Sequence, residues 1–213
     1  MTAVGAAAFA TPLVLGYAVL FGILRQRAEP APYDPRVRHR VTERMVSETE
    51  RMATKLAPTF AANDVQGRRH TLAEFLEKGP VLVTFINVDC PCSRDAEPMY
   101  QALADAYPGI TVVGVAGASS AEATKWAKAN HCGHLVLADT DLRIVHAYGA
   151  ISSVYTALIT PLGKIVKMWP GYSQAMMQEV SDKAADLLGV SPVKLPTKLA
   201  PAEMAAGCAF PNY

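Results

Sequence analysis

Two adjoining stretches decide the fold of this chain: Val81-Leu-Val-Thr-Phe-Ile-Asn87 and, after two residues, Cys90-Pro-Cys-Ser93. The first is a nearly unbroken apolar run rich in β-branched residues, which predicts a central strand buried on both faces. The residues from Ser93 to Tyr107 repeat apolar side chains at helical spacing, so a helix follows at once. The two nearby cysteines, Cys90 and Cys92, therefore fall where a buried strand ends and a helix begins.

Strand and helix patterns alternate on both sides of this unit. A short strand is expected at 59–62, and Thr71-Leu-Ala-Glu74 fits a capping box that opens a helix. Further strands are expected at 110–115, 134–139, 156–160 and 164–169, and helices at 120–129, 141–148 and 173–188. This order predicts an α/β fold whose sheet carries helices on both faces.

The chain before this domain has a different character. Residues 3–24 contain no charged side chain and, at ~1.5 Å per residue, are long enough to cross a hydrocarbon layer of ~30 Å. We expect a transmembrane anchor within 1–25. The weaker alternatives are a buried soluble helix and a cleaved secretory signal, since the run has no basic segment before it. Residues 26–56 then read as a proline-rich spacer and a helix that either packs on the domain or stands apart as a stalk.

Composition excludes several classes of protein. The chain has 213 residues, 51% of them hydrophobic, and a formal net charge of +1. This charge gives no general attraction to nucleic acid, and the apolar content is too high for a disordered chain. Four cysteines are too few for a disulfide scaffold, but they suffice for a redox pair, a metal site or a reactive thiol.

Cys90 is the residue for which the sequence predicts chemistry. A helix N-terminus has unpaired N–H groups and a partial positive charge, which lower the pKa of a thiol below its free value of ~8.5. The adjacent Asp89 carboxylate acts in the opposite direction. We expect Cys90 to be a nucleophile whose sulfur is uncovered at the edge of the sheet.

Four groups of residues carry a resemblance to a known family: Ala57-Pro-Thr-Phe60, Val81-Leu-Val-Thr-Phe85, Cys90-Pro91 with Pro98, and Thr156-Ala-Leu-Ile with Gly163-Lys-Ile-Val166. Residues 57–189 resemble the thioredoxin-like superfamily in its redoxin, AhpC-TSA and membrane-anchored thiol–disulfide oxidoreductase branch. The resemblance implies a central mixed sheet with helices on both faces and a redox-active cysteine, without a cofactor. Residues 190–213 remain as a C-terminal tail that contains Cys208.

The chain departs from the family pattern at three places. Cys90 aligns with the attacking cysteine of the family, but Ser93 occupies the position of the resolving cysteine. Val154 takes the place of the usual cis-proline. Peroxiredoxins carry Pro-x-x-x-Thr-x-x-Cys, and Val83 and Asn87 occupy the proline and threonine positions here. These departures weaken the expectation of ordinary peroxidase activity.

Two thiols are candidates to resolve a mixed disulfide on Cys90. Cys92 is nearest, although a Cys-x-Cys ring is strained and the side chains diverge if both residues lie in the helix. Cys208 lies in a tail that can fold back over the site. We expect Cys132 to be a small buried hydrophobe. His131 and His134 could join Cys90 and Cys92 at a soft metal, but they are expected at the opposite end of the sheet, so we expect no metal ion.

Three functions compete at this stage. The first is a membrane-tethered oxidoreductase that acts on protein cysteines through the Cys-Pro-Cys-Ser motif, with Cys90 attacking and Cys92 or Cys208 resolving. The second is a peroxiredoxin-like peroxidase that oxidises Cys90 to a sulfenic acid. The third is a non-catalytic subunit of a larger membrane complex. Delivery of a soft metal is a weaker fourth possibility.

Topology and partners follow from the same arguments. Five arginines at 25, 27, 36, 38 and 40 follow the apolar run, and the positive-inside rule therefore places the domain in the cytoplasm. The resemblance implies the other side, because disulfide chemistry operates in oxidising compartments. We expect a single-pass cell-membrane protein with an extracytoplasmic domain. Its expected partners are membrane lipid along residues 3–24 and a protein thiol or disulfide, but no nucleic acid.

Overall fold

The computed structural model describes residues 39–211 of the chain. The predicted anchor and most of the predicted spacer, 26–38, lie outside these residues. Among the helices of residues 39–211, none has both the length and the apolar character that a membrane span requires.

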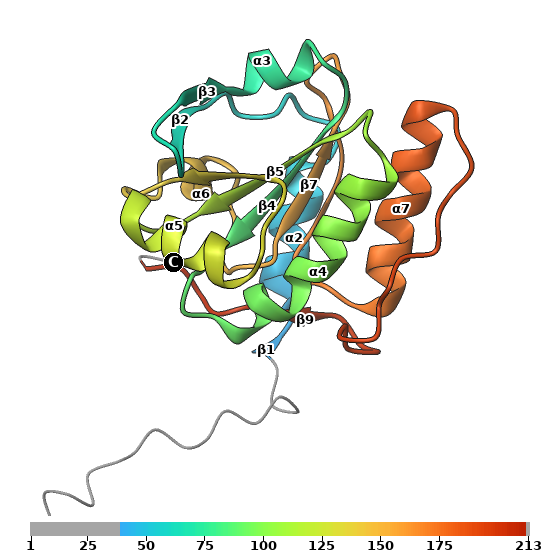
Figure 1. Cartoon of the computed structure of the whole chain (residues 1–213). Helices are drawn as coiled ribbons and strands as arrows, with labels where there is room; N and C mark the ends of the chain where they lie inside the picture. Colours follow the sequence, from blue (N-terminus) through green and yellow to red (C-terminus); the bar gives the residue numbers. More distant parts are fainter. Residues whose placement is uncertain (1–38, 212–213) are drawn as a thin grey trace, which may run out of the picture. The chain divides into compact units, whose positions relative to one another are not determined.

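The described residues form a seven-stranded mixed sheet (Figure 1). Its strands are β2 (Ala61–Asp64), β3 (Arg69–Thr71), β4 (Val81–Ile86), β5 (Thr111–Ala116), β6 (Leu135–Ala138), β7 (Thr156–Ile159) and β8 (Ile165–Trp169). They lie in the order β3-β2-β6-β5-β4-β7-β8. The three central strands β4, β5 and β6 are parallel, while β7 runs antiparallel to β4 and β2 antiparallel to β6. The predicted mixed α/β sheet is confirmed, and the predicted strand at 59–62 begins two residues later.

Helices cover both faces of the sheet. The helices are α2 (Glu43–Met52), α3 (Leu72–Leu76), α4 (Pro91–Ala106), α5 (Ser120–Ala129), α6 (Arg143–Ala147) and α7 (Gln174–Leu188). Because side chains of a strand alternate between faces, Leu82 of β4 packs with α4 and α7 whereas Val83 and Phe85 pack with α2 and α6. Figure 1 shows α4 and α7 in front of the sheet and α2 behind it.

The helix α2 packs on the domain instead of forming a stalk. Met52 is buried in the same apolar cluster as Phe60 and Ile165, and α2 contacts β8. Thr42 caps the helix by accepting the N–H of Met45 at 3.3 Å. The stalk interpretation of this helix is wrong, because its apolar stripe has a partner on the sheet. The compact unit therefore includes α2 and does not begin at residue 57.

The C-terminal tail is also part of the domain. Its strand β9 (Ala205–Ala206) pairs antiparallel with β1 (His39–Arg40). Ala205 exchanges two backbone hydrogen bonds with Tyr172, and Phe210 is buried in the core. A side chain at Gly171 would bring its Cβ within 2.3 Å of the Ala205 oxygen, so only glycine permits this approach. In Figure 1 the tail (red) passes below the first turn of α4.

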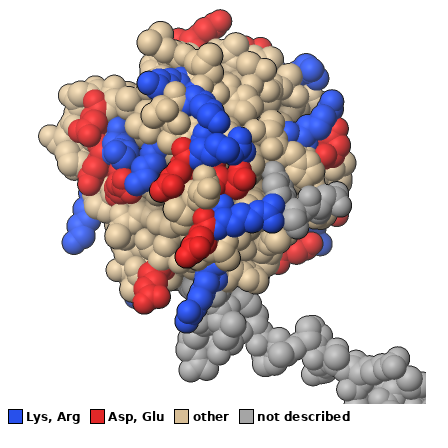
Figure 2. All heavy atoms as spheres, turned by 180° about the vertical axis from the view of Figure 1, so that it is seen from behind, with Lys and Arg blue, Asp and Glu red and all other residues tan. Residues whose placement is uncertain are grey.

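Charged side chains of both signs are scattered over the face seen from behind (Figure 2). Arg51 pairs with Glu48, and Arg143 pairs with Asp141, each at 2.6 Å. The basic and acidic groups of this face lie side by side, in agreement with the near-neutral charge of the chain.

The packing of α4 on the sheet gives a stability prediction. Leu103 of α4 is fully buried, and Leu103→Ala removes its contacts and leaves a cavity. The free energy of unfolding should fall by about 2–5 kcal/mol. Leu162 is 88% exposed, and Leu162→Ala is the control, with an expected change below about 0.5 kcal/mol. Urea denaturation of both variants tests this prediction, which fails if they lose equal stability.

Candidate active site around Cys90

Cys90 lies at the junction that the sequence predicts. It is the N-cap residue of α4, with extended backbone angles, and Pro91 occupies the first helical position. The carbonyl of Cys90 accepts the N–H of Ser93 at 3.1 Å and the N–H of Arg94 at 3.4 Å. These bonds begin the helix directly after the cysteine. Pro91 suits the first helical position, because its fixed φ is that of a helix and it has no N–H group that would need an acceptor. The sulfur is thus held at the positive end of a 16-residue helix.

Hydrogen-bond donors surround the Cys90 sulfur. The backbone N–H of Cys208 donates to Sγ at 3.0 Å. The largest effect on the pKa of Cys90 is a hydrogen bond from the Cys92 thiol. Burial opposes it, but further bonds from the Cys208 thiol, the Ser153 hydroxyl and the Cys208 N–H lower the pKa to about 4. Cys90 is therefore a thiolate at neutral pH, even though Asp89 is its neighbour in sequence.

The Cys90 sulfur is covered, which contradicts the predicted exposure. Only 2% of the residue is accessible, because the C-terminal tail lies over it. The Cys208 carbonyl accepts the N–H of Ser153 at 2.9 Å, and the Gly207 N–H donates to the Ser153 carbonyl at 3.2 Å. A Cβ at Gly207 would lie 2.9 Å from that carbonyl oxygen, so the tail fits closely only because this position is glycine. The prediction of an open sulfur failed because the sequence does not reveal where the tail folds.

Cys92 and Cys208 both reach Cys90. Divergence of their side chains requires both cysteines to lie in the helix, but Cys90 is the N-cap residue outside it, and its side chain meets that of Cys92. Burial is the first cause that raises the pKa of Cys208, to about 12, followed by the hydrogen bond and the charge of Cys90. The site therefore holds one thiolate beside a half-buried thiol at Cys208.

Three neighbouring residues complete the site, and the sequence pattern indicated two of them, Ser93 and Val154, but not Ser153. The buried Ser153 hydroxyl contributes to the lowered pKa of Cys90, and in the sequence only its position beside Val154 could have indicated this. Val154 occupies the predicted cis-proline position with a left-handed φ of 59°, which is strained for a β-branched residue. Its N–H donates to the Phe85 carbonyl at 2.7 Å. Ser93, in place of a resolving cysteine, accepts the N–H of Asn87 at 3.2 Å and closes the loop before Cys90.

A cleft of about 470 Å³ borders Cys90 and continues along α5. Its wall combines the ring of Trp126 with charged groups of both signs, Asp89, Arg94, Glu122 and Lys125. A larger cleft of about 660 Å³ lies between β2 and α6 and is lined by none of the cysteines. Of these two clefts, the smaller one has Cys90 in its wall.

Cys132 and His134 lie away from the Cys90 sulfur. They belong to the loop between α5 and β6, and they meet Glu97 of α4. Burial and the Glu97 carboxylate raise the pKa of Cys132, so this thiol is not a nucleophile at neutral pH. Cys132 packs against an apolar cluster but is only half-buried, whereas the sequence predicted a small buried hydrophobic residue. Within residues 39–211, Cys132 and His134 are grouped with Glu97 and not with Cys90 and Cys92, the alternative that the sequence disfavoured.

The hydrogen bonds to Cys90 give a pH prediction. Alkylation of Cys90 by iodoacetamide should be independent of pH from 6 to 8 and fall to half near pH 4, where the thiolate gains a proton. Because folding lowers this pKa, the same group should stabilise the fold increasingly as the pH rises from about 4 towards its unfolded value.

Mass spectrometry of the peptide that contains Cys90 measures the profile. Ser153→Ala removes one donor and should move the midpoint to higher pH. A wild-type midpoint near ~8.5, the value of a free thiol, would contradict the assignment.

Comparisons with known proteins find a matching family and a curated relative. The model of the AhpC/TSA family matches residues 53–168. Thiol-disulfide oxidoreductase ResA of Bacillus subtilis (strain 168) is 30% identical over 122 residues, which cover 54% of this chain and 65% of the relative. The match thus spans slightly less than two thirds of that relative.

Solved structures share the fold. The thioredoxin domain of a thiol-disulfide oxidoreductase from Bacteroides vulgatus superposes with a TM-score of 0.51 at 21% identity, over 55% of this chain and 86% of its own. Peroxidoxin BcpB from Mycobacterium tuberculosis gives a TM-score of 0.56 at 19% identity, over 65% and 96% of the two chains. These similarities confirm the thioredoxin-like α/β fold.

Proposed function

Because the chain belongs to the AhpC/TSA family, we propose that it is a thiol–disulfide oxidoreductase that acts on protein cysteines through Cys90. The observation that carries this proposal is the contact of a thiolate, Cys90, with a second thiol, Cys208, whose N–H lies 3.0 Å from the Cys90 sulfur. The similarity to ResA supports the same chemistry. The cleft beside Cys90 has the mixed charge and the aromatic wall that suit an extended peptide.

The reaction uses two successive exchanges. The Cys90 thiolate attacks one sulfur of a substrate disulfide, so a mixed disulfide forms and the other substrate sulfur leaves as a thiolate. The second thiol then loses its proton and attacks the Cys90 sulfur, which releases the remaining substrate thiolate. Two electrons have passed to the substrate, and this chain holds an intramolecular disulfide. A reduced thiol donor returns it to the dithiol state, and all steps run in reverse when the substrate is reduced.

Cys208 fits the resolving role better than Cys92. A Cys90–Cys92 bond closes a small strained ring, whereas 117 residues separate Cys90 from Cys208 and impose no such ring. Two of the causes that raise the pKa of Cys208, the hydrogen bond and the charge of Cys90, disappear once Cys90 is in a mixed disulfide. Formation of the intermediate therefore activates the thiol that resolves it.

A redox titration tests the proposal. The full chain is equilibrated in glutathione buffers of increasing potential, quenched with an alkylating reagent and mapped by mass spectrometry. We expect a Cys90–Cys208 disulfide in the wild type and in Cys92→Ser, and a stable glutathione adduct on Cys90 in Cys208→Ser. If all four thiols stay reduced across the titration, the oxidoreductase proposal fails. If Cys208→Ser forms a Cys90–Cys92 disulfide, Cys92 takes the resolving role.

The covered thiolate also favours a second candidate, a peroxidase. A low-pKa sulfur that receives an N–H bond is the form that a peroxide oxidises to sulfenic acid. Val83 and Asn87, at the positions of the peroxiredoxin proline and threonine, provide no hydroxyl for the peroxide. Stopped-flow consumption of hydrogen peroxide distinguishes the two, since a peroxidase is faster with peroxide than with a disulfide. A subunit of a membrane complex without catalysis would show neither reaction.

We also propose that residues 3–24 tether the domain to the cell membrane and that the domain lies outside the cytoplasm. The charge-free apolar run supports the tether, and the oxidising environment that disulfide chemistry requires supports the location. Labelling of intact cells with a membrane-impermeant maleimide, compared with lysed cells, tests the side. Labelling of Cys208 only after lysis would place the domain in the cytoplasm, as the arginines after the run predict.

A further inference from the structure

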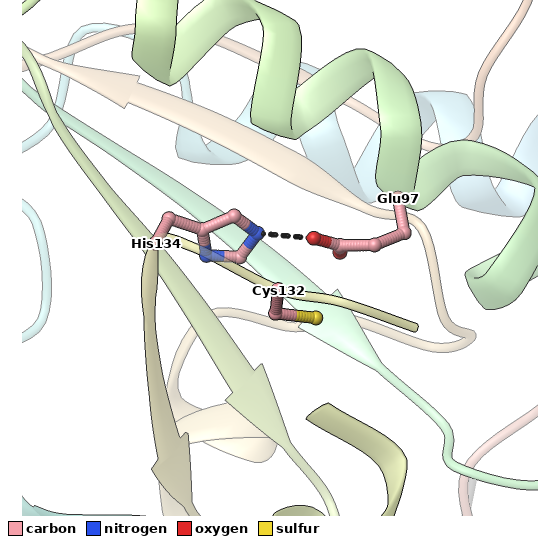
Figure 3. Close-up of side chains that lie close together, drawn as sticks. All are labelled: Glu97, Cys132 and His134. Carbon is pink, nitrogen blue, oxygen red and sulfur yellow. Dashed lines mark ion pairs between the residues drawn. The ribbon is translucent and has the colours of Figure 1, made fainter. Parts of the chain in front are cut away.

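A second cluster of reactive side chains lies apart from the Cys90 site. Glu97 projects from α4, and Cys132 and His134 come from the loop between α5 and β6; Figure 3 shows the three side chains directed at one another. His134 Nε2 lies 2.8 Å from a Glu97 carboxylate oxygen. Each residue offers one possible ligand atom: the Cys132 sulfur, a His134 ring nitrogen and a Glu97 carboxylate oxygen. These three atoms lie within 4.8 Å of one another.

The cluster is built into the interior. The side chains of Glu97 and His134 are each 2% exposed, and Ile86, Trp126 and Val136 form the apolar cluster beside them. Buried charges in such surroundings are costly unless they are paired or coordinate a metal. Cys132 is half-buried, so the cluster has a way to the solvent on one side.

The surroundings prepare His134 for a ligand. Its Nδ1 lies 3.2 Å from the Leu135 carbonyl, and a proton held there leaves Nε2 to bind a metal once the proton that Nε2 shares with Glu97 is displaced. Metal-bound histidines are commonly fixed by such a bond from the second ring nitrogen. A Cβ at Gly114 would lie 3.3 Å from His134 Cε1, so the glycine makes room for the ring. The Gly133 N–H donates to Gln101 of α4 at 2.7 Å and holds the loop in place.

We propose that Glu97, Cys132 and His134 form a Zn(II) site, with water as the fourth ligand. Sulfur, imidazole and carboxylate together are donors that zinc accepts in tetrahedral geometry. On binding, a Zn–S bond forms at Cys132 and its thiol proton passes to the solvent, as does any proton on His134 Nε2. The bound ion would fasten the α5–β6 loop to α4, the helix that begins at Cys90.

The test separates this site from the cysteines around Cys90. The full chain is purified in detergent, freed of metal, reduced with a phosphine and titrated with Zn(II) against a chromophoric chelator. We expect one equivalent in the wild type and in Cys90→Ser/Cys92→Ser/Cys208→Ser, which retains only Cys132. Cys132→Ser and His134→Gln should weaken binding by at least about 100-fold, because each removes a direct ligand. Glu97→Gln, of nearly equal size, should weaken it in the same direction.

Two further measurements guard against misfolded variants. Co(II) bound to the triple serine variant should show a thiolate-to-metal charge-transfer band in the near-ultraviolet, and X-ray absorption of its Zn(II) form should show a single sulfur ligand. The melting temperature of the triple variant should rise with Zn(II). Absence of binding in the wild type, loss of binding in the triple variant, or two or more sulfur ligands in the wild-type Zn(II) form would overturn the proposal.

Discussion

Replacement of Cys90 by serine is expected to lower the rate of thiol–disulfide exchange by at least about 1,000-fold. The hydroxyl keeps the size of the thiol but stays protonated at neutral pH, so the donors from Cys92, Ser153 and Cys208 no longer stabilise an anion. A peptide disulfide with a fluorescent reporter measures the rate, and circular dichroism checks the fold.

Leu162→Ala is the control for this experiment. Leu162 lies in the turn between β7 and β8. This turn is at the end of the sheet where β4 begins, because Ile159 pairs with Val81, whereas Cys90 follows the other end of β4. The control should retain the wild-type rate. Exchange that persists in Cys90→Ser would show that another thiol performs the reaction.

Gly171→Ala is expected to uncover Cys90 and to raise its rate of alkylation by at least about 10-fold, because access to a buried thiol requires local opening. The new Cβ would lie 2.3 Å from the Ala205 oxygen, and neither backbone can yield without breaking the hydrogen bonds between Tyr172 and Ala205. The tail that carries Cys208 must then move. The midpoint of the alkylation profile should also rise above about 4, because the donors on Cys208 are lost.

Gly67→Ala is the matched control for Gly171→Ala. Gly67 has a positive φ in the turn between β2 and β3, and a Cβ there meets no atom within 4 Å. This variant bears the backbone strain of a Gly→Ala change without touching the tail. Equal alkylation rates in the two variants would show that the tail does not control access to Cys90.

Much of the fold follows from local sequence. The apolar run at β4 and the hairpin of β7 and β8 appear where alternation and turn residues predict them, since buried strands need apolar side chains on both faces. Ser119 and Ser173 cap α5 and α7, and Gly189 ends α7 in a left-handed conformation. Helix ends are readable because their unpaired N–H and C=O groups need nearby partners.

The candidate site was only partly predictable. The position of Cys90 is readable in the sequence, since the end of a strand and the start of a helix are both local patterns. Glu97 reads in the sequence as one more polar residue of a helix, and nothing local places it against Cys132 and His134. Contacts across 35 or more residues depend on how α4 and α5 pack, which local spacing does not encode.

The amino-acid sequence by itself determined the order of the central strands and helices and the place of Cys90 between a buried strand and a helix, because these depend on periodicity and on neighbouring residues. Tertiary structure alone decided that the tail covers Cys90, that Ser153 and Cys208 join its hydrogen bonds, and that α2 packs on the sheet. Each of these depends on the close approach of segments far apart in the chain. Glycines such as Gly171 permit that approach, and only the folded backbone shows what they approach.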